Sequence, residues 1–272
     1  MCGRYSNETE FSHIRLLFQA ADSTFRPWTP KYNISPSSAG GFEQLIVTAD
    51  RPGSRQIRLA RFWFIPSTWQ RPLNQLPTTF NARSEDLTRR RMWQKPFETT
   101  RCLVPATGWR EFLGPSSPKQ PYHFRLAEST DQTPQTFAFA GLHSTWTSPD
   151  GEAVDSFAIL TTAPSAAAAP IHDRMPLVLP SELYDAWLTE PAARHQVLAR
   201  AQAAALDLPL EIFPSDPVAN NVHYEGPAAV HRAHPSSAPL APRRARRGAE
   251  SAELPARQLS LLDHLPGTRR RS

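Results

Sequence analysis

The sequence lacks several features that would place it in a common class. No apolar run approaches the roughly 18 to 20 residues that a membrane span needs, and residues 1–10 contain no apolar signal-peptide core. Two cysteines, Cys2 and Cys102, are too few for a disulfide framework. Glycines number only 11 against 28 prolines, which disfavours a helical bundle. We therefore expect a cytoplasmic protein built from short strands and rigid loops.

Aromatic residues are missing from the end of the chain, where positive charge is concentrated. Residues 228–272 hold nine arginines, three acidic residues and no Phe, Tyr or Trp, whereas residues 1–227 hold 21 basic and 22 acidic residues. A segment with so little apolar surface cannot offset the entropy lost on folding. We expect one domain over residues 2–227, followed by a disordered arm rich in Arg, Pro and Ala over residues 228–272.

Hydrophobic periodicity predicts an α+β domain dominated by a sheet, with flanking helices. A helix is expected over residues 7–21, with Asn7 and Glu10 as a capping box, and two more over residues 181–188 and 191–206. Short apolar runs bounded by proline and polar clusters predict strands at residues 44–49, 57–64, 101–105, 121–126, 136–142 and 156–162. Helices do not alternate with strands, so a doubly wound parallel sheet is disfavoured.

Cys2 follows the initiator methionine, so removal of Met1 would give an α-amine and a thiol on adjacent carbons. The α-amine has a pKa of roughly 7.7 to 8.0 and is partly neutral at pH 7. It can attack an aldehyde to form an imine, and the adjacent thiol can close on the imine carbon to give a thiazolidine. A lone cysteine in a frayed terminus is the structural alternative.

Seven segments occur in a characteristic order: MCGRYS, YNISPS, FNARSEDL, RCLVPATGWREF, AFAGLHSTW, SFAILTT and IHDRMPLVL. Together they resemble the SRAP family (SOS-response-associated peptidase, abasic-site processing proteins) over residues 2 to about 224. The resemblance implies an SRAP-type fold. It also implies a DNA repair function, in which the N-terminal cysteine crosslinks to the ring-opened aldehyde of an abasic site in single-stranded DNA.

The resemblance assigns catalytic roles to four residues. Cys2 is the nucleophile, and Asn81 lies beside it as a hydrogen-bonding amide. Glu111 moves protons during imine formation, and His172 delivers a proton to the opening sugar oxygen. The structural alternatives are a turn-forming Asn, a solvated acid and a structural histidine.

Two groups of residues are expected to bind DNA. Guanidinium groups around the lesion suit phosphate oxygens, and the family positions correspond to Arg4, Arg83 and Arg174. Rigid apolar surfaces for stacking against bases correspond to Pro36, Phe62, Trp63 and Phe112. Ion pairing and core packing are the structural alternatives for these side chains.

The chain departs from the family pattern at two positions. Trp63 stands where the family usually has Gly in W-G-L-I-P, and Phe112 stands where a tryptophan usually follows the catalytic glutamate. These changes affect the stacking surface more than the chemistry. Cys102, in a strand-like run, is expected to be a buried, inert thiol.

Two other functions compete with DNA crosslinking. A cysteine peptidase or autopeptidase would use Cys2, His172 and Glu111 as a hydrolytic group. A non-covalent single-stranded-DNA-binding module would use the arginines and aromatics alone. The nine histidines form no ligand cluster, so neither a metal nor another cofactor is expected. We expect a monomer, without a membrane partner, associated with the bacterial nucleoid.

The arm contains one short motif. The peptide Gln258, Leu259, Ser260, Leu261 and Leu262 is similar to the Q-L-S-L-F type by which bacterial polymerases and repair proteins dock on the replication sliding clamp. Its last residue is Leu rather than Phe, and a chance match is the alternative. The arm arginines suit non-specific attraction to DNA phosphates.

Overall fold

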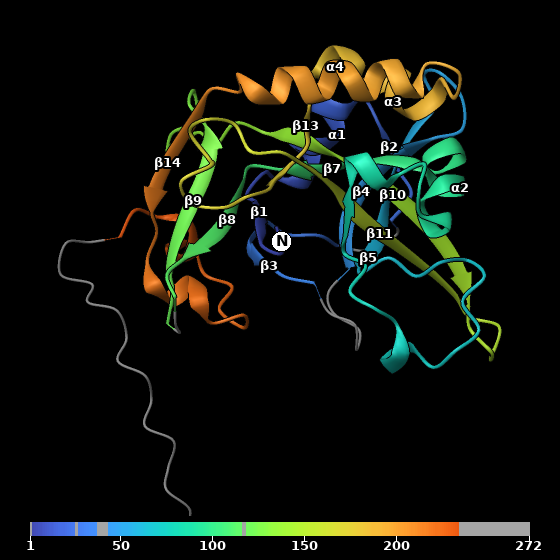
Figure 1. The fold of residues 1–272 in the computed structure, drawn as a ribbon, viewed down its shortest axis with the longest axis horizontal. Coiled ribbons are helices and arrows are strands. Elements are labelled where there is room, and N and C mark those ends of the chain that lie inside the picture. The colour runs from blue at the N-terminus through green and yellow to red at the C-terminus, as the bar shows by residue number, and fades with distance from the viewer. Residues whose placement is uncertain (1, 25–26, 37–42, 116–117, 234–272) are drawn as a thin grey trace, which may run out of the picture. The chain divides into compact units, whose positions relative to one another are not determined.

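A computed structural model describes residues 2–24, 27–36, 43–115 and 118–233 (Figure 1). The chain divides into two compact units, Met1–Leu240 and Ala241–Ser272, and the second lies outside the described residues. The peptide at 258–262 and most of the expected arm therefore lie outside them as well.

The first sheet has five strands in the described residues, all paired antiparallel. Its order is β14 (Leu210–Pro214), β9 (Gln120–Leu126), β8 (Gly108–Leu113), β1 (Tyr5–Asn7) and β3 (Lys31–Ile34). The strand next to the N-terminus, β1, thus lies between β3 and β8 (Figure 1). This pairing places residue 2 next to the strand that carries Glu111.

The second sheet closes on itself, because β11 pairs in parallel with β5 as well as antiparallel with β10. Its order is β12 (Met175–Pro176), β11 (Ala153–Thr162), β10 (Phe137–Thr147), β7 (Arg101–Ala106), β4 (Glu43–Ala49), β5 (Arg55–Phe62) and β2 (Ala21–Asp22). Two further short strands attach to it: β13 (Val178–Leu179) on β10, and β6 (Asn81–Arg83) on β11. The barrel-like closure removes free edges from the central strands.

Helices cover the outside of the sheets. They are α1 (Phe11–Phe18), α2 (Arg91–Thr99), α3 (Tyr184–Thr189) and α4 (Arg194–Leu206), with 3-10 turns η1 (Leu73–Gln75), η2 (Ser84–Asp86), η3 (Ser181–Leu183), η4 (Pro217–Asn220) and η5 (Pro227–Val230). Helices α3 and α4 lie together across one end of the domain, at the top of Figure 1. None of the helices in the described ranges is long and apolar enough to cross a membrane.

The sheet-dominated α+β class is confirmed, and each expected strand lies on an observed one. The expected helix at 7–21 begins too early, because Asn7 pairs with Lys31 in the first sheet and is buried. The helix starts only at Phe11, and Glu10 at its N-cap makes no side-chain capping hydrogen bond, so the expected capping box is wrong. Ile14 and Phe18 supply the buried face of the helix.

The domain continues beyond the expected boundary at residue 227. Ala229 and Val230 are buried, and Arg232 forms a β-bridge with Ser215. The fully buried Arg110 donates to the carbonyl oxygen of Ala229 at 2.9 Å. A buried guanidinium needs such partners, so residues 228–232 belong to the domain rather than to the arm.

The aromatic core holds β8 in place behind the site. Trp109 of β8 is fully buried, stacks on Phe124 and meets Phe139 edge to face. At Gly108 a Cβ atom would lie 2.6 Å from the His123 ring, so only glycine permits this close approach of β8 and β9. Side chains alternate along a strand, so Glu111 shares the face of Trp109.

Candidate functional site

The site forms where the two sheets meet beside the N-terminus. The first sheet supplies Cys2 and Glu111, since residue 2 precedes β1 and Glu111 lies on β8. Asn81 begins β6 of the second sheet, and its Nδ2 donates to the Cys2 carbonyl oxygen at 3.2 Å. His172 and Arg174 lie on the segment that leads into β12. The structure therefore brings together all four predicted catalytic residues.

The Cys2 thiol is enclosed and protonated. Cys2 is 2% exposed, and its Sγ donates to the carbonyl oxygen of Arg174 at 3.6 Å. Burial raises the pKa of the thiol well above its usual value, and the neighbouring Glu111 carboxyl raises it further. The thiol thus needs a base at the moment when it reacts.

Glu111 is a buried carboxyl that holds its proton near neutral pH. It is 3% exposed, and burial raises its pKa to about 7. Its Oε2 lies 3.7 Å from His172 Nε2, whereas its Oε1 is buried and has no hydrogen-bond partner among the described residues. A carboxyl with such a pKa can both accept and donate a proton at pH 7.

His172 is held by the backbone of Arg174. Its Nδ1 lies 3.0 Å from the Arg174 backbone nitrogen and 3.1 Å from the Arg174 carbonyl oxygen. Burial lowers the pKa of the imidazole, so the neutral ring is favoured. The Nε2 atom faces Glu111, and this places a second proton carrier at the carboxyl.

Asn81 keeps one polar atom available at the site. Its Nδ2 is bound to backbone carbonyls of Cys2 and Ile159, but its buried Oδ1 has no partner in the described part of the chain. An unsatisfied buried acceptor is costly unless a ligand satisfies it. The geometry suits a hydroxyl donor of a bound molecule.

The three predicted phosphate-binding arginines differ in their surroundings. Arg174 is engaged by Glu85 and by the carbonyl oxygen of Thr161. Arg4 donates to Asn33 Oδ1 and lies over the Phe112 ring. Arg83 is exposed and forms no ion pair with the described residues. Arg83 is thus the one of the three whose guanidinium has no competing partner there.

The predicted stacking residues separate into two groups. Pro36 and the Phe80 ring lie within 3.8 Å of the position of a Cβ at Gly3, and Trp63 packs edge-on against Phe80. Pro36 and Trp63 are half-buried, so this apolar surface beside Cys2 retains contact with solvent. Phe80 was not among the predicted site residues, although it directly precedes Asn81 in the motif.

Phe62 and Phe112 do not belong to this surface. Phe62 is 2% exposed and stacks on Phe157 in the core, so the expectation that it meets a base is wrong. Phe112 follows Glu111 on β8 and therefore points to the opposite face, where it contacts Arg4. Cys102 is fully buried on β7, and burial raises the pKa of its thiol, as expected for an inert cysteine.

Sequence reasoning also missed Glu85 and Thr161. Both hold the Arg174 guanidinium, although they lie on η2 and β11. Glu85 was visible in the N-A-R-S-E segment, but no sequence pattern shows that its partner is 89 residues away. Thr161 carried no signal of its own.

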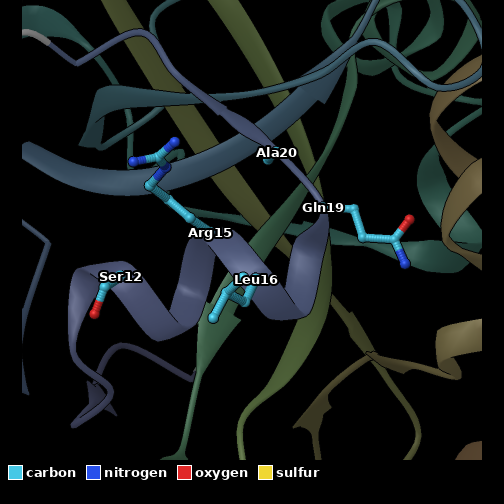
Figure 2. A pocket seen from close by; sticks show the side chains of 5 residues that line it. All are labelled: Ser12, Arg15, Leu16, Gln19 and Ala20. Carbon is cyan, nitrogen blue, oxygen red and sulfur yellow. The ribbon is translucent and has the colours of Figure 1, made fainter.

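A separate hollow of about 450 Å³ lies along the outer side of α1. Figure 2 shows the side chains that line it: Ser12, Arg15, Leu16, Gln19 and Ala20. Arg15 is the one ionisable group among these five, and none of them is a thiol or a carboxyl. The lining thus offers no acid–base pair, unlike the surroundings of Cys2.

Comparison with known proteins identifies the family. The SRAP family, described as SOS response associated peptidase, matches residues 1–223. The chain therefore belongs to the SRAP family. Its relatives bear a more specific name. The chain is 34% identical to the abasic site processing protein YoqW of Bacillus subtilis over 194 residues, which cover 69% of this chain and 80% of that protein.

Two further comparisons agree with this assignment. The abasic site processing protein YedK of Escherichia coli is 26% identical over 227 residues, covering 82% of this chain and 94% of the relative. A crystal structure of a protein from Bacteroides thetaiotaomicron has a TM-score of 0.70 at 19% identity, with 86% of this chain and all of that chain covered. The second comparison shows that the fold is shared.

Proposed function

We propose that this protein repairs DNA by forming a covalent thiazolidine crosslink between Cys2 and the aldehyde of an abasic site in single-stranded DNA. One observation carries the proposal: the Cys2 thiol, the Glu111 carboxyl and the Asn81 amide meet in one buried place. The matching relatives are named abasic site processing proteins, and that name supports the choice of substrate.

The bond changes balance without an oxidant or another cofactor. After removal of Met1, the neutral α-amine of Cys2 adds to the C1′ aldehyde and gives a carbinolamine. Loss of one water forms the imine. The thiol sulfur then adds to the imine carbon while its proton passes to a base, which closes the five-membered ring. The net change is one C–N and one C–S bond formed and one water released.

Glu111 has a pKa suited to two of these steps. Its protonated form can donate to the departing hydroxyl of the carbinolamine, and the resulting carboxylate can accept the thiol proton during ring closure. The buried Oε1, which has no hydrogen-bond partner in the described part of the chain, is the atom available for this exchange. His172, 3.7 Å from Oε2, gives or takes the proton when the sugar ring opens.

Peptidase action on other proteins fits the site less well. A hydrolytic cysteine requires a lowered thiol pKa, usually from a hydrogen bond to a histidine. Here burial raises the thiol pKa, and Sγ donates a hydrogen bond to the Arg174 carbonyl oxygen rather than to His172. Cleavage limited to the residue ahead of Cys2 is the peptidase activity that we retain as an alternative. Non-covalent binding of single strands is the second alternative.

The C-terminal arm supplies a proposed partner. We place the sliding-clamp contact at Gln258, Leu259, Leu261 and Leu262, because a glutamine followed by leucines suits a polar subsite beside an apolar pocket. A peptide spanning residues 256–266 should bind the clamp with micromolar-scale affinity. Gln258→Ala with Leu261→Ala should remove that binding and leave crosslinking on naked DNA unchanged. No binding of the intact protein to the clamp contradicts the assignment.

The function is tested by incubating the purified protein with single-stranded DNA that carries one abasic site. A heat-stable band of reduced mobility on a denaturing gel, with an intact mass equal to protein without Met1 plus DNA minus one water, is the expected result. Peptide hydrolysis without an adduct supports the peptidase. Salt-sensitive binding on a native gel alone supports the non-covalent module.

A further inference from the structure

Attraction of DNA phosphates to this site requires positive charge from basic residues that have not yet been assigned a role. Residues 1–227 hold 21 basic and 22 acidic residues, so the domain has no general attraction for a polyanion. Arg174 is already neutralised by Glu85. Binding to DNA therefore depends on unpaired basic side chains gathered in one part of the surface.

The segment after Asn81 gathers such side chains. Residues 83–95 contain five basic residues and two acidic ones, and both acids are occupied: Glu85 by Arg174, and Asp86 by Arg90. Arg89 and Arg91 are exposed and, like Arg83, form no ion pair with any described residue. We call Arg83, Arg89 and Arg91 the arginine ridge.

The arginine ridge starts at the site and stays close to it. Asn81, which binds the Cys2 carbonyl, is two residues before Arg83 on β6. The backbone nitrogens of Arg89 and Arg90 both donate to the Asp86 carbonyl oxygen, at 3.1 and 3.0 Å, so the chain folds back there. Arg91 is ten residues after Asn81, and ten residues span at most about 36 Å even when fully extended. At about 3.4 Å per nucleotide in a DNA strand, this is no more than about ten nucleotides from Asn81, and the turn at Asp86 shortens the distance further.

A rigid base supports the distal end of the arginine ridge. Helix α2 begins at Arg91 and is fixed to the core by Trp93 and Phe97, which are 4% and 1% exposed. Cationic side chains at the amino end of a helix oppose its dipole, so local stability does not explain arginines at this position. Sequence choices that conflict with local stability are expected at functional surfaces.

We propose that Arg89 and Arg91 bind phosphates of the DNA strand on one side of the abasic site, as a continuation of Arg83. This inference rests on the proposed function, because it takes the lesion to lie at Cys2. It adds a direction to that function: the strand leaves the site along β6 toward the start of α2, rather than over the rest of residues 1–227, which hold 16 basic and 20 acidic residues.

The test compares two double variants of the full chain. Arg89→Gln with Arg91→Gln removes the distal charges of the arginine ridge, and Arg51→Gln with Arg200→Gln removes two exposed arginines elsewhere that have no ion pair in the described residues. Neither pair contacts Cys2 in the structure. Affinity is measured against salt on three abasic oligonucleotides: one with long flanks, one with a long 5′ flank only and one with a long 3′ flank only.

The ridge variant should bind the long oligonucleotide about tenfold more weakly, and its salt slope should fall by about 1.4, since each single-strand phosphate contact contributes about 0.7. The loss should appear with only one of the two one-sided flanks, and the adduct rate at saturating DNA should be unchanged. Equal loss on both flanks, or the same loss in the control variant, overturns the proposal. So does unchanged affinity.

The outcome is independent of the crosslinking chemistry. If the wild-type protein makes no adduct but the ridge variant still loses affinity on one flank, the arginine ridge stands and the proposed covalent function fails. If the wild-type protein makes the adduct and the ridge variant binds normally, the function stands and the arginine ridge is wrong.

Discussion

Glu85 accepts hydrogen bonds from both terminal nitrogens of Arg174, at 2.5 and 2.9 Å. Partial burial is the largest single effect and acts to raise the pKa of Glu85, but the hydrogen bonds from Arg174, the backbone and Ser84, together with the Arg174 charge, outweigh it and lower the pKa. The pair therefore stays ionised well below neutral pH. It also fixes the residue whose carbonyl oxygen receives the Cys2 thiol and whose backbone holds His172.

We expect Glu85→Gln to separate DNA binding from chemistry. Losing the carboxylate frees the Arg174 charge for a phosphate, so affinity for single-stranded DNA at low salt should rise several-fold. The Arg174 backbone loses its support, so the adduct rate at saturating DNA should fall about tenfold, equivalent to about 1.4 kcal/mol. Glu152→Gln, an exposed acid on the turn between β10 and β11, is the charge-matched control. If Glu152→Gln changed the DNA affinity and the adduct rate as much as Glu85→Gln does, the role assigned to Glu85 would be contradicted.

Cys2 variants test which nucleophile makes the stable product. Cys2→Ala should abolish the heat-stable adduct and leave non-covalent affinity within about twofold, because no phosphate contact is lost. Cys2→Ser keeps the amine, so borohydride should trap an imine that does not survive heating without reduction. An adduct from Cys2→Ala as stable as that of the wild type would exclude the thiazolidine.

The pH dependence of the adduct rate should be bell-shaped. Attack needs the neutral amine, which increases as pH rises toward a pKa of roughly 7.7 to 8.0. Expulsion of water needs protonated Glu111, which is lost as pH rises through about 7. Glu111→Gln should slow the reaction by roughly 10²- to 10⁴-fold and remove the alkaline decline. His172→Ala should slow it on the same scale with affinity unchanged. A Glu111→Gln profile with the wild-type decline contradicts this role.

Glu111 should also cost folding stability at alkaline pH. Its folded pKa of about 7 lies above the ordinary value of 4.5, so the folded state binds the proton more tightly than the unfolded state. The stability that this proton provides is complete below about 4.5 and is lost as pH rises to about 7. Glu111→Gln should therefore raise the Tm relative to the wild type at pH 8 more than at pH 5. Thermal unfolding at the two pH values measures this difference.

Trp63 and Phe62 are neighbours in sequence with opposite expected effects. Trp63→Ala should weaken DNA binding by about 1–3 kcal/mol, the scale of one stacked base, with a smaller effect on folding. Phe62→Ala should lower the free energy of unfolding by about 3–5 kcal/mol, because it empties a core position. Denaturant titrations and DNA binding at a temperature where both variants are folded separate the two effects. If Trp63→Ala bound DNA as tightly as the wild-type protein, the stacking role of Trp63 would be contradicted.

The sequence predicted the elements whose patterns are local. Short apolar runs located the strands that became β4, β5, β7, β9, β10 and β11, and motif order brought together Cys2, Asn81, Glu111 and His172. Helix α2 was not predicted, because three arginines at its start and Pro96 within it hide the apolar face formed by Trp93 and Phe97. Strand β8 was missed because the charged residues Arg110 and Glu111, both buried, interrupt its apolar run.

Side-chain roles that depend on distant partners could not be predicted. Phe62 and Trp63 differ by one position, yet Phe62 ends β5 opposite Phe157 in the core, whereas Trp63 follows the strand and packs against Phe80. Arg4 and Arg174 look alike in sequence, yet one meets the amide of Asn33 and the other a carboxylate. These partners are set by the closure of the sheets, which no local pattern encodes.

The enclosure of the Cys2 thiol should protect it from oxidation and alkylation before it meets an abasic site. Oxidants and alkylating agents react with exposed thiolates. Cys2 is 2% exposed, and burial together with the neighbouring Glu111 carboxyl raises the pKa of its thiol, so the sulfur is protonated and poorly accessible to such reagents. Peroxides in the cell should therefore spare this cysteine under the oxidative conditions that damage DNA bases. The Cys2 thiol should therefore stay unreacted until an aldehyde that fits the site reaches it.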